Sequence, residues 1–306
     1  MLKKGASATA YERFFREIEV VKNMNHPSII KIIDHSRPED SLHYYVMEYI
    51  PGAKSLKRYM DLAENPFKEK PLQAVGLFIR IVEVIKYCKG HGIQHRHLSP
   101  ANILIVTSES IKVIDFGLCH VADGTTITLT NEAVGTPDYM APECEAGAEG
   151  QVDWRSDFYS AGKILWSAVT GSLAFSRDPP VFDHKSMVTL FPYRPDIWHL
   201  QSIFEKTIRR DASKRWQAPD AALQHARTLQ FLISSGYPPL ELIKNRCPVC
   251  GQGILGEFRH TVVFANVVQP PGGDDYDRLT GGYCGFCLAR NRRIMNQSLE
   301  QRWPDE

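Results

Sequence analysis

The segment Gly236-Tyr237-Pro238-Pro239 divides the 306-residue sequence into two parts of very different size. Its glycine and prolines interrupt helices and strands, so we expect a linker over residues 234–245. The larger part, residues 1–233, is long enough to bury a hydrophobic core. The smaller part, residues 246–306, buries little core alone, and chains of that size commonly need a metal or disulfides. We therefore predict two domains that are stabilised in different ways.

The overall composition argues against several classes of protein. Lys and Arg number 36 and Asp and Glu number 35, so the net charge of +1 gives no electrostatic reason to expect nucleic acid or an anionic membrane as the main partner. No apolar run approaches the ~20 residues of a membrane helix. Met1-Leu2-Lys3-Lys4-Gly5 is not followed by the apolar core of a secretory signal. We therefore predict a cytoplasmic protein with no membrane partner, for which nucleic acid is an unlikely partner.

Helical and extended patterns alternate along the larger part. Apolar residues at helical spacing predict amphipathic helices, and runs of branched and aromatic residues predict strands. A Thr-rich stretch at 118–138 and a Pro-rich piece at 178–195 indicate irregular structure. The expected class is α+β. The expected helices span residues 9–24, 55–64, 72–90 and most of 155–233, and the expected strands span residues 28–36, 42–50, 103–106 and 111–114, the last two forming a hairpin.

Three short motifs follow one another in the larger part. Residues 95–104 read HRHLSPANIL and follow an expected helix, residues 115–117 read Asp-Phe-Gly after an expected strand, and residues 141–143 read Ala-Pro-Glu after the Thr-rich stretch. Each motif alone is a weak signal, but their order and separation together are a strong one. They resemble the catalytic loop, metal-binding turn and activation-segment end of a protein kinase. The resemblance covers roughly residues 1–233.

Further positions agree with this resemblance. Gly135-Thr136-Pro137 precedes the third motif as in serine/threonine kinases, and Ser156-Asp157-Phe158-Tyr159-Ser160 opens an apolar helix like the long central helix of the family. Arg215 stands where the family has an arginine paired with the glutamate of Ala-Pro-Glu, here Glu143. His95 matches the histidine that packs under the metal-binding turn. The resemblance implies a kinase-like fold with a mostly helical large lobe and an incomplete small lobe of one helix and two or three strands.

The resemblance also implies a nucleotide site. Phosphoryl transfer depends on positioning and on metal ions that neutralise phosphate oxygens. In the family pattern, Asn102 and Asp115 hold Mg²⁺, which prefers carboxylate and amide oxygens. Glu17 corresponds to the helix glutamate that orients a phosphate-binding lysine. Met47 stands at the gatekeeper position, and residues 48–50, from Glu48 to Ile50, offer backbone groups to the adenine of ATP.

The catalytic loop departs from the family pattern at two positions. His97 replaces the catalytic aspartate and Ser99 replaces the nearby lysine. An imidazole can accept a proton but carries no negative charge, and loss of a general base typically costs about 10²–10⁴ in rate. We therefore expect weak or absent phosphotransfer, with His97 either a working base or an inert substitution. A metal site formed by His95 and His97 is a further, weaker alternative.

A second departure lies before the first expected helix. No G-x-G-x-x-G motif precedes Glu17, and Lys3 and Lys4 are closer to Glu17 than the family's strand lysine is to its glutamate. The start of the sequence resembles the third strand of the small lobe. A late start codon, a shortened sequence and a real absence of the front all remain open. With no visible partner lysine, we expect Glu17 to be a solvated helix residue.

The smaller part carries two Cys-x-x-Cys pairs, which place four thiolates in two groups. Such pairs can hold structural Zn²⁺ tetrahedrally. The 33 intervening residues allow two strands at 254–268 and an exposed loop at 269–282, so this part resembles a zinc ribbon. The alternative is a pair of redox disulfides, which would need a thioredoxin-like context. The predicted zinc ligands are Cys247, Cys250, Cys284 and Cys287.

Three functional hypotheses follow from these patterns. The first is a serine/threonine kinase whose printed sequence is truncated and which acts on a protein substrate. The second is a pseudokinase that serves as a binding or regulatory module for a protein partner. The third is an adaptor in which the zinc ribbon contacts protein or nucleic acid. Three minor features also stay open. Threonines 125, 126, 128 and 130 are candidate phosphorylation sites that would pair with Arg96, and Arg290, Arg292 and Arg293 form a short basic cluster. We expect Cys88, Cys119 and Cys144 to be small buried residues.

Overall fold

A computed structural model describes residues 7–61, 65–107, 109–116, 120–121, 137–144, 152–174, 186–191 and 194–236. Its contacts divide the chain into two units. One unit comprises Met1–Asp178 with Ile203–Gln230, and the other comprises Pro179–Ser202 with Phe231–Glu306. The four cysteines of the predicted zinc ribbon lie outside the described residues, as does most of the Thr-rich stretch.

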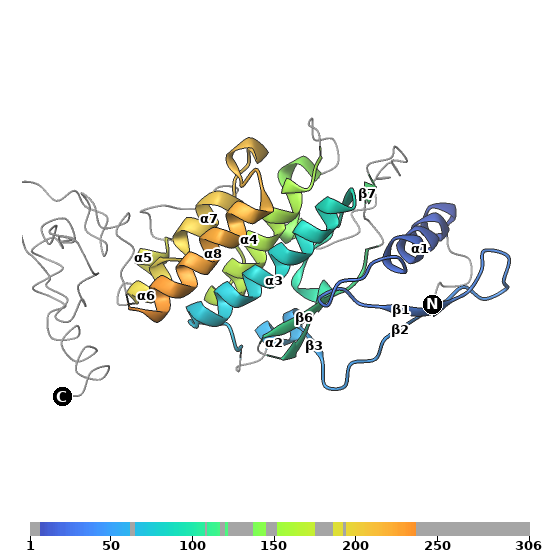
Figure 1. Cartoon of the computed structure of the whole chain (residues 1–306), viewed down its shortest axis with the longest axis horizontal. Helices are drawn as coiled ribbons and strands as arrows, with labels where there is room; N and C mark the ends of the chain where they lie inside the picture. The colour runs from blue at the N-terminus through green and yellow to red at the C-terminus, as the bar shows by residue number, and fades with distance from the viewer. Residues whose placement is uncertain are drawn as a thin grey trace, which may run out of the picture. The chain divides into compact units, whose positions relative to one another are not determined.

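The first described elements are one helix and two strands (Figure 1). Helix α1 spans Ala8–Val21, and the Ser7 side chain caps it by accepting a hydrogen bond from the N–H of Ala10. The apolar stripe of α1 is buried, which explains its amphipathic sequence. Strands β1 (Ile32–His35) and β2 (Tyr45–Met47) pair antiparallel. Both strands are shorter than the runs of branched and aromatic residues that predicted them.

A small antiparallel sheet confirms the predicted hairpin. Strand β5 (Ile103–Thr107) pairs with β6 (Ser110–Val113), and β3 (Lys54–Ser55) pairs with the other edge of β5. The inward side chains of the hairpin, such as Ile103 and Val113, are fully buried. This sheet directs the chain into the two motif segments, because HRHLSPANIL enters β5 and Asp-Phe-Gly follows β6.

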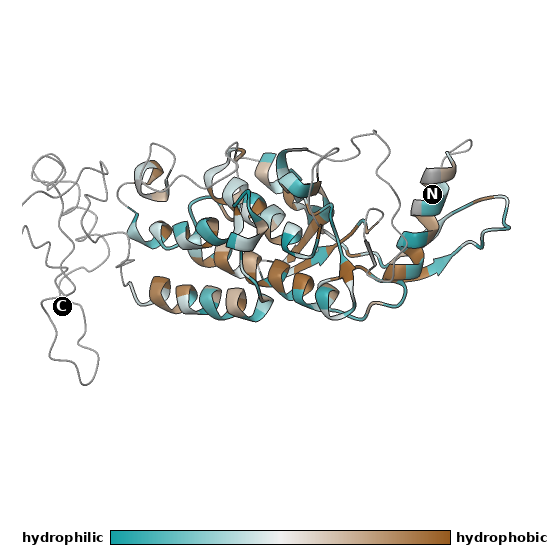
Figure 2. Ribbon diagram, turned by 90° about the horizontal axis from the view of Figure 1, so that it is seen from above, coloured by the Kyte–Doolittle hydropathy of each residue, from teal (hydrophilic) through white to brown (hydrophobic). Residues whose placement is uncertain are grey.

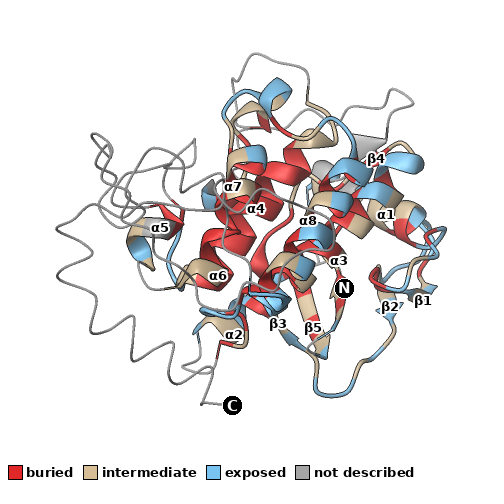
Figure 3. Cartoon of the chain, turned by 60° about the vertical axis from the view of Figure 1, so that its left-hand side comes forward, coloured by how far each residue is buried: buried red, intermediate tan, exposed pale blue. Residues whose placement is uncertain are grey.

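Long helices form most of the rest of the first unit. Helix α3 (Pro71–Gly90) starts with a proline, which suits the first turn. It packs against α4 (Arg155–Thr170), whose side chains are nearly all buried (Figure 3), and Gly171 ends α4 in a left-handed conformation with a φ of 72°. Figure 2 shows apolar residues, in brown, concentrated on the long helices in the middle of the picture. Helix α8 (Pro219–Ser234) is as long as α4, with 16 residues. The shorter elements are α2 (Leu56–Asp61), α7 (Gln201–Thr207) and the 3₁₀ turns Pro100–Asn102, Pro137–Tyr139, Pro142–Cys144 and Ala212–Lys214.

Two regions differ from the expected irregular structure. Strand β7 (His120–Val121) lies inside the Thr-rich stretch and pairs with β4 (Ile93–Gln94), just before the catalytic-loop motif. In the second unit, the Pro-rich piece contains the one-turn helix α5 (Met187–Leu190) and the start of α6 (Pro195–Trp198). Both differences involve elements of two to four residues, which are too short to create a periodic signal. Within the described residues, no helix combines the length and apolar character needed to cross a membrane.

Candidate active site

Asp157, in the first turn of α4, anchors the catalytic-loop motif. Its two carboxylate oxygens accept hydrogen bonds from the backbone N–H groups of His95 and Arg96, both at 2.9 Å. Asp157 is 1% exposed, and this burial raises its pKa to about 6, against the opposite effect of the two hydrogen bonds. Arg96 takes a left-handed φ of 62°. The most buried helix of the unit thus fixes the backbone next to His97.

His95 lies beneath the Asp-Phe-Gly turn, as the resemblance implied. Its ring is buried, Nε2 is 3.2 Å from the carbonyl oxygen of Ile114, and the ring centroid is 4.4 Å from that of Phe116. Burial lowers its pKa to about 4. His95 is therefore a neutral packing residue near pH 7.

The structure brings His97, Asn102 and Asp115 together. Nδ1 of His97 lies 3.3 Å from Oδ2 of Asp115 and 3.2 Å from Nδ2 of Asn102. The same Asn102 nitrogen donates to the backbone carbonyl of His97 at 3.0 Å. Asn102 ends the 3₁₀ turn before β5, and Asp115 follows β6 with a φ of 62°. The hairpin therefore places an amide, a carboxylate and an imidazole at one point.

Glu17 differs from the expectation of a solvated helix residue. Its Oε1 accepts hydrogen bonds from the Tyr45 hydroxyl and from the backbone N–H of Phe116, both at 3.2 Å. Burial and the nearby Asp115 carboxylate raise the pKa of Glu17 to about 7. No local pattern indicates this contact, because it depends on how α1 packs against the Asp-Phe-Gly turn. Glu17 is thus part of the candidate site.

The predicted adenine-contacting segment follows β2. The N–H of Glu48 donates to the Lys31 carbonyl at 3.0 Å, and its carboxylate pairs with Lys112 at 2.6 Å. The carbonyl of Ile50 accepts from Ala53 at 3.2 Å. Met47, at the predicted gatekeeper position, is 39% exposed. The side chain of Glu48 is therefore used within the fold, so any contact of this residue with a nucleotide falls to its backbone.

Glu143 and Arg215 form the ion pair that the sequence predicted. The guanidinium of Arg215 makes two hydrogen bonds to the carboxylate, of 2.5 and 2.8 Å, and its side chain has no exposed surface. Cys88 and Cys144 are buried, as expected for small core residues. This pair connects the Ala-Pro-Glu motif to the segment before α8.

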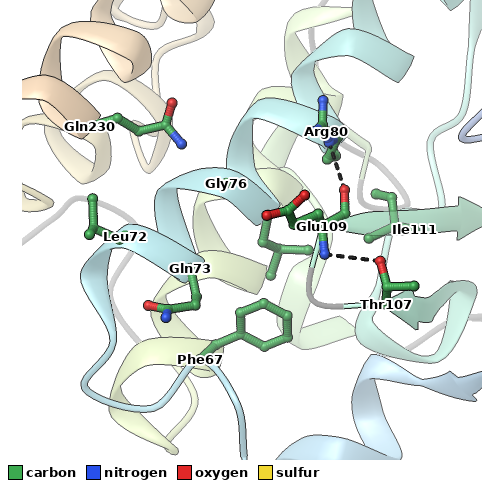
Figure 4. A pocket seen from close by; sticks show the side chains of 10 residues that line it. Phe67, Leu72, Gln73, Gly76, Arg80, Thr107, Glu109, Ile111 and Gln230 are labelled. Atoms are coloured by element: carbon green, nitrogen blue, oxygen red, sulfur yellow. Dashed lines mark hydrogen bonds between the residues drawn. The ribbon is translucent and has the colours of Figure 1, made fainter. Parts of the chain in front are cut away.

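A separate cavity of about 440 Å³ is lined by residues outside the His97 cluster (Figure 4). One face of α3 lines it with Gly76 and Arg80, the turn of the hairpin contributes Glu109, and Gln230 of α8 and Phe67 complete it. Figure 4 shows Arg80 directed to the backbone carbonyl of Glu109, at 3.0 Å. Sequence reasoning missed this cavity, because its residues come from four separate segments and share no motif.

The described residues contain no group of three or more His, Cys, Asp and Glu side chains that could bind a metal. The His97 cluster has two such residues, and its third member is an amide. The predicted zinc ligands Cys247, Cys250, Cys284 and Cys287 are outside the part of the chain that was described, so the zinc site stays a prediction.

Comparison with known proteins gives a consistent result. Residues 1–226 match the family model described as the protein kinase domain. "Serine/threonine-protein kinase PknB" of Mycobacterium leprae is 34% identical over 239 residues, which are 75% of this chain and 37% of that protein. "Serine/threonine-protein kinase PrkC" of Bacillus subtilis is 37% identical over 169 residues, which are 55% of this chain and 25% of that protein. The aligned part is thus well under half the length of these relatives.

Proposed function

The chain belongs to the protein kinase family, and from that premise we propose that it binds ATP with a divalent cation and transfers phosphate weakly or not at all. The family of serine/threonine kinases to which it is similar gives the reaction class, which is transfer to a protein hydroxyl. The observation that carries the reduced activity is the position of His97. Its Nδ1 faces Asn102 and Asp115, where the family pattern has an aspartate as base.

The chemistry of this position explains the expected loss. A base must carry away the proton of the attacking hydroxyl, and an anionic base also attracts that proton electrostatically. His97 supplies an imidazole nitrogen that already contacts the amide of Asn102. Replacement of the neighbouring lysine by Ser99, which is buried, removes a cation from the phosphate site. Both changes disfavour the transition state of phosphoryl transfer.

The residues for nucleotide and metal fit the proposal. Asn102 directs its amide nitrogen to the His97 carbonyl, so its oxygen is the ligand atom, and Asp115 adds a carboxylate. A bound cation would neutralise charge on the phosphate oxygens. Glu17 holds the backbone of Phe116 next to Asp115. The backbone of residues 48–50, which follow the gatekeeper Met47, would position adenine.

The activity and the partners of the whole protein are part of the proposal. A chain with little transfer can act as a regulatory module that binds another protein. We propose a cytoplasmic location, in line with the composition. We also propose that the cysteine-rich part is a zinc ribbon that adds a contact with another protein. The runner-up function is an adaptor led by that ribbon.

Two measurements test this function. Thermal unfolding with Mg-ATP should show a rise in melting temperature for the wild type, because a ligand of the native state stabilises it by mass action. Asp115→Ala should remove the rise, and Glu39→Ala, at an exposed site, should keep it. An equal rise in Asp115→Ala would contradict the nucleotide site.

Phosphotransfer to a generic protein substrate tests the role of position 97. His97→Asp should raise the rate about tenfold or more above the wild type, since a general base is worth about 10²–10⁴. Efficient transfer by the wild type, with no gain in His97→Asp, would contradict the proposal of impaired catalysis.

A further inference from the structure

One oxygen of the Glu17 carboxylate joins three elements of the first unit. Glu17 lies on α1, and its Oε1 accepts hydrogen bonds from the hydroxyl of Tyr45 on β2 and from the backbone N–H of Phe116 in the Asp-Phe-Gly turn, both at 3.2 Å. A carboxylate oxygen has two lone pairs, so one atom can accept from both donors. Both donors are neutral, whereas the family pattern gives this glutamate a lysine as partner. The bond from Tyr45 is therefore a contact that the resemblance does not imply.

The packing of β2 against α1 directs the Tyr45 hydroxyl to this carboxylate. Alternate residues of an extended strand share a face, and His43 and Tyr45 both pack on α1. The ring centroid of His43 lies 5.0 Å from that of Tyr11, and the ring centroid of Tyr45 lies 5.5 Å from that of Phe14. Phe14 and Glu17 are three residues apart and so lie on one side of the helix. The ring of Tyr45 is thus held beside α1 with its hydroxyl at Glu17.

The Asp-Phe-Gly turn has a conformation that needs such support. Asp115 has a φ of 62°, which is disfavoured for a residue other than glycine and persists where surrounding contacts hold it. The ring of the next residue, Phe116, is fully buried and packs on His95, with the ring centroids 4.4 Å apart. The N–H of Phe116 belongs to the peptide that directly follows Asp115, and Glu17 accepts its hydrogen bond. The Glu17 bond therefore helps to set the direction of the Asp115 side chain.

From these contacts we infer that Tyr45 is a positioning residue: its hydroxyl orients Glu17, and Glu17 holds the turn that presents Asp115 to the divalent cation. The inference rests on the proposed function, because Asp115 is the proposed cation ligand. Without the hydroxyl, Oε1 of Glu17 keeps one of its two donors, and the flexible side chain is no longer fixed against the turn.

Amide hydrogen exchange in the full-length protein, without nucleotide, tests the link between Tyr45 and the turn. Selective ¹⁵N-phenylalanine labelling follows the N–H of Phe116 by NMR, and the signal is assigned by its loss in Phe116→Leu. Tyr45→Phe removes the hydroxyl and keeps the ring, so it should speed exchange of this amide about threefold or more. Tyr44→Phe removes a hydroxyl from the other face of the strand and should leave the exchange rate unchanged. An unchanged rate in Tyr45→Phe would overturn the inference.

Ligand binding separates positioning of Asp115 from a general structural role of Tyr45. Tyr45→Phe should weaken binding of Mg-ATP about threefold to tenfold, the effect of a lost hydrogen bond to a carboxylate. It should leave binding of adenosine unchanged, because adenosine has no phosphate that shares a cation with Asp115. Isothermal titration calorimetry measures both ligands, with Tyr44→Phe again as the matched control. An equal loss for Mg-ATP and adenosine would overturn the inference, since it would show a general change in the nucleotide site.

A double-mutant cycle shows whether Tyr45 acts through Glu17. Glu17→Ala should weaken Mg-ATP binding at least as much as Tyr45→Phe, and the double variant should bind no more weakly than Glu17→Ala. A full additional loss in the double variant would also overturn the inference. A wild type that binds no Mg-ATP would contradict the proposed function alone, because the exchange rate of Phe116 still shows whether Tyr45 holds the turn.

Discussion

At the scale of single residues, the Arg215 guanidinium is the clearest case of a buried charge with a dedicated partner. Its side chain is fully buried and makes two hydrogen bonds to Glu143. Arg215→Ala would leave the Glu143 carboxylate uncompensated, so we expect a loss of about 3–5 kcal/mol in the free energy of unfolding. Arg215→Lys keeps the charge but not the paired geometry and should lose an intermediate amount. Urea unfolding measures both, with Arg227→Ala, at an exposed position, as a control that should change stability by less than about 0.5 kcal/mol.

His95 gives a residue-scale prediction about pH. Burial lowers its folded pKa to about 4, from 6.5 for an unperturbed histidine. Between these values the unfolded chain binds more protons than the native state, so the contribution of His95 to stability falls as pH drops from 6.5 to 4. The difference corresponds to about 3 kcal/mol at most. His95→Phe should flatten the acid side of the stability curve measured by urea unfolding. Identical slopes in the wild type and His95→Phe would contradict the assignment.

At the scale of elements, two helix glycines give predictions of opposite sign. Thr207 is the last residue of α7. A Cβ added to Gly162 of α4 would lie 2.1 Å from Oγ1 of Thr207 and 2.6 Å from its Cβ. Gly162→Ala should therefore destabilise the protein by about 1–3 kcal/mol despite the higher helix propensity of alanine. A Cβ on Gly76 of α3 would meet only the Gln230 side chain, at 4.0 Å. Gly76→Ala should stabilise by about 0.5–1 kcal/mol. Thermal unfolding of the two variants checks both signs, and a stabilising Gly162→Ala would show that α4 and α7 are not packed this closely.

The elements also show what the sequence could predict. Helix α3 and the β5–β6 hairpin have strong periodicity, and their bounds agree with the prediction within a few residues. Helix α4 begins at residue 155, where the predicted helical region starts, but its end was not predicted. Strand β7 and helix α5 were missed because two to four residues carry no period. The motif residues His97, Asn102 and Asp115 were identified through the resemblance, whereas the Glu17 contact depends on tertiary packing that no motif records.

At the scale of the whole molecule, the chain combines a large helical body with a cysteine-rich end. The kinase match stops at residue 226, before the predicted linker at 234–245. The remaining 80 residues carry both Cys-x-x-Cys pairs. The kinase match ends before this segment and supplies no expectation for it. Its stability must therefore be argued from its own residues.

The last prediction concerns the metal in this segment. Zinc binding contributes apparent free energies of about 10–16 kcal/mol in small zinc peptides, so a segment with little core should fold only with metal. We expect one Zn²⁺ per full-length chain, and Cys250→Ser should remove it, whereas Cys119→Ser should keep it while losing one titratable thiol. Metal analysis of protein purified without added zinc decides this, and thiol titration tests the rival pair of redox disulfides. Zinc near zero, with thiols that titrate only after reduction, would establish the disulfides instead. Because the predicted linker separates the parts, removal of zinc should leave the melting temperature of the kinase body unchanged, and a shared transition would show that the two parts fold as one.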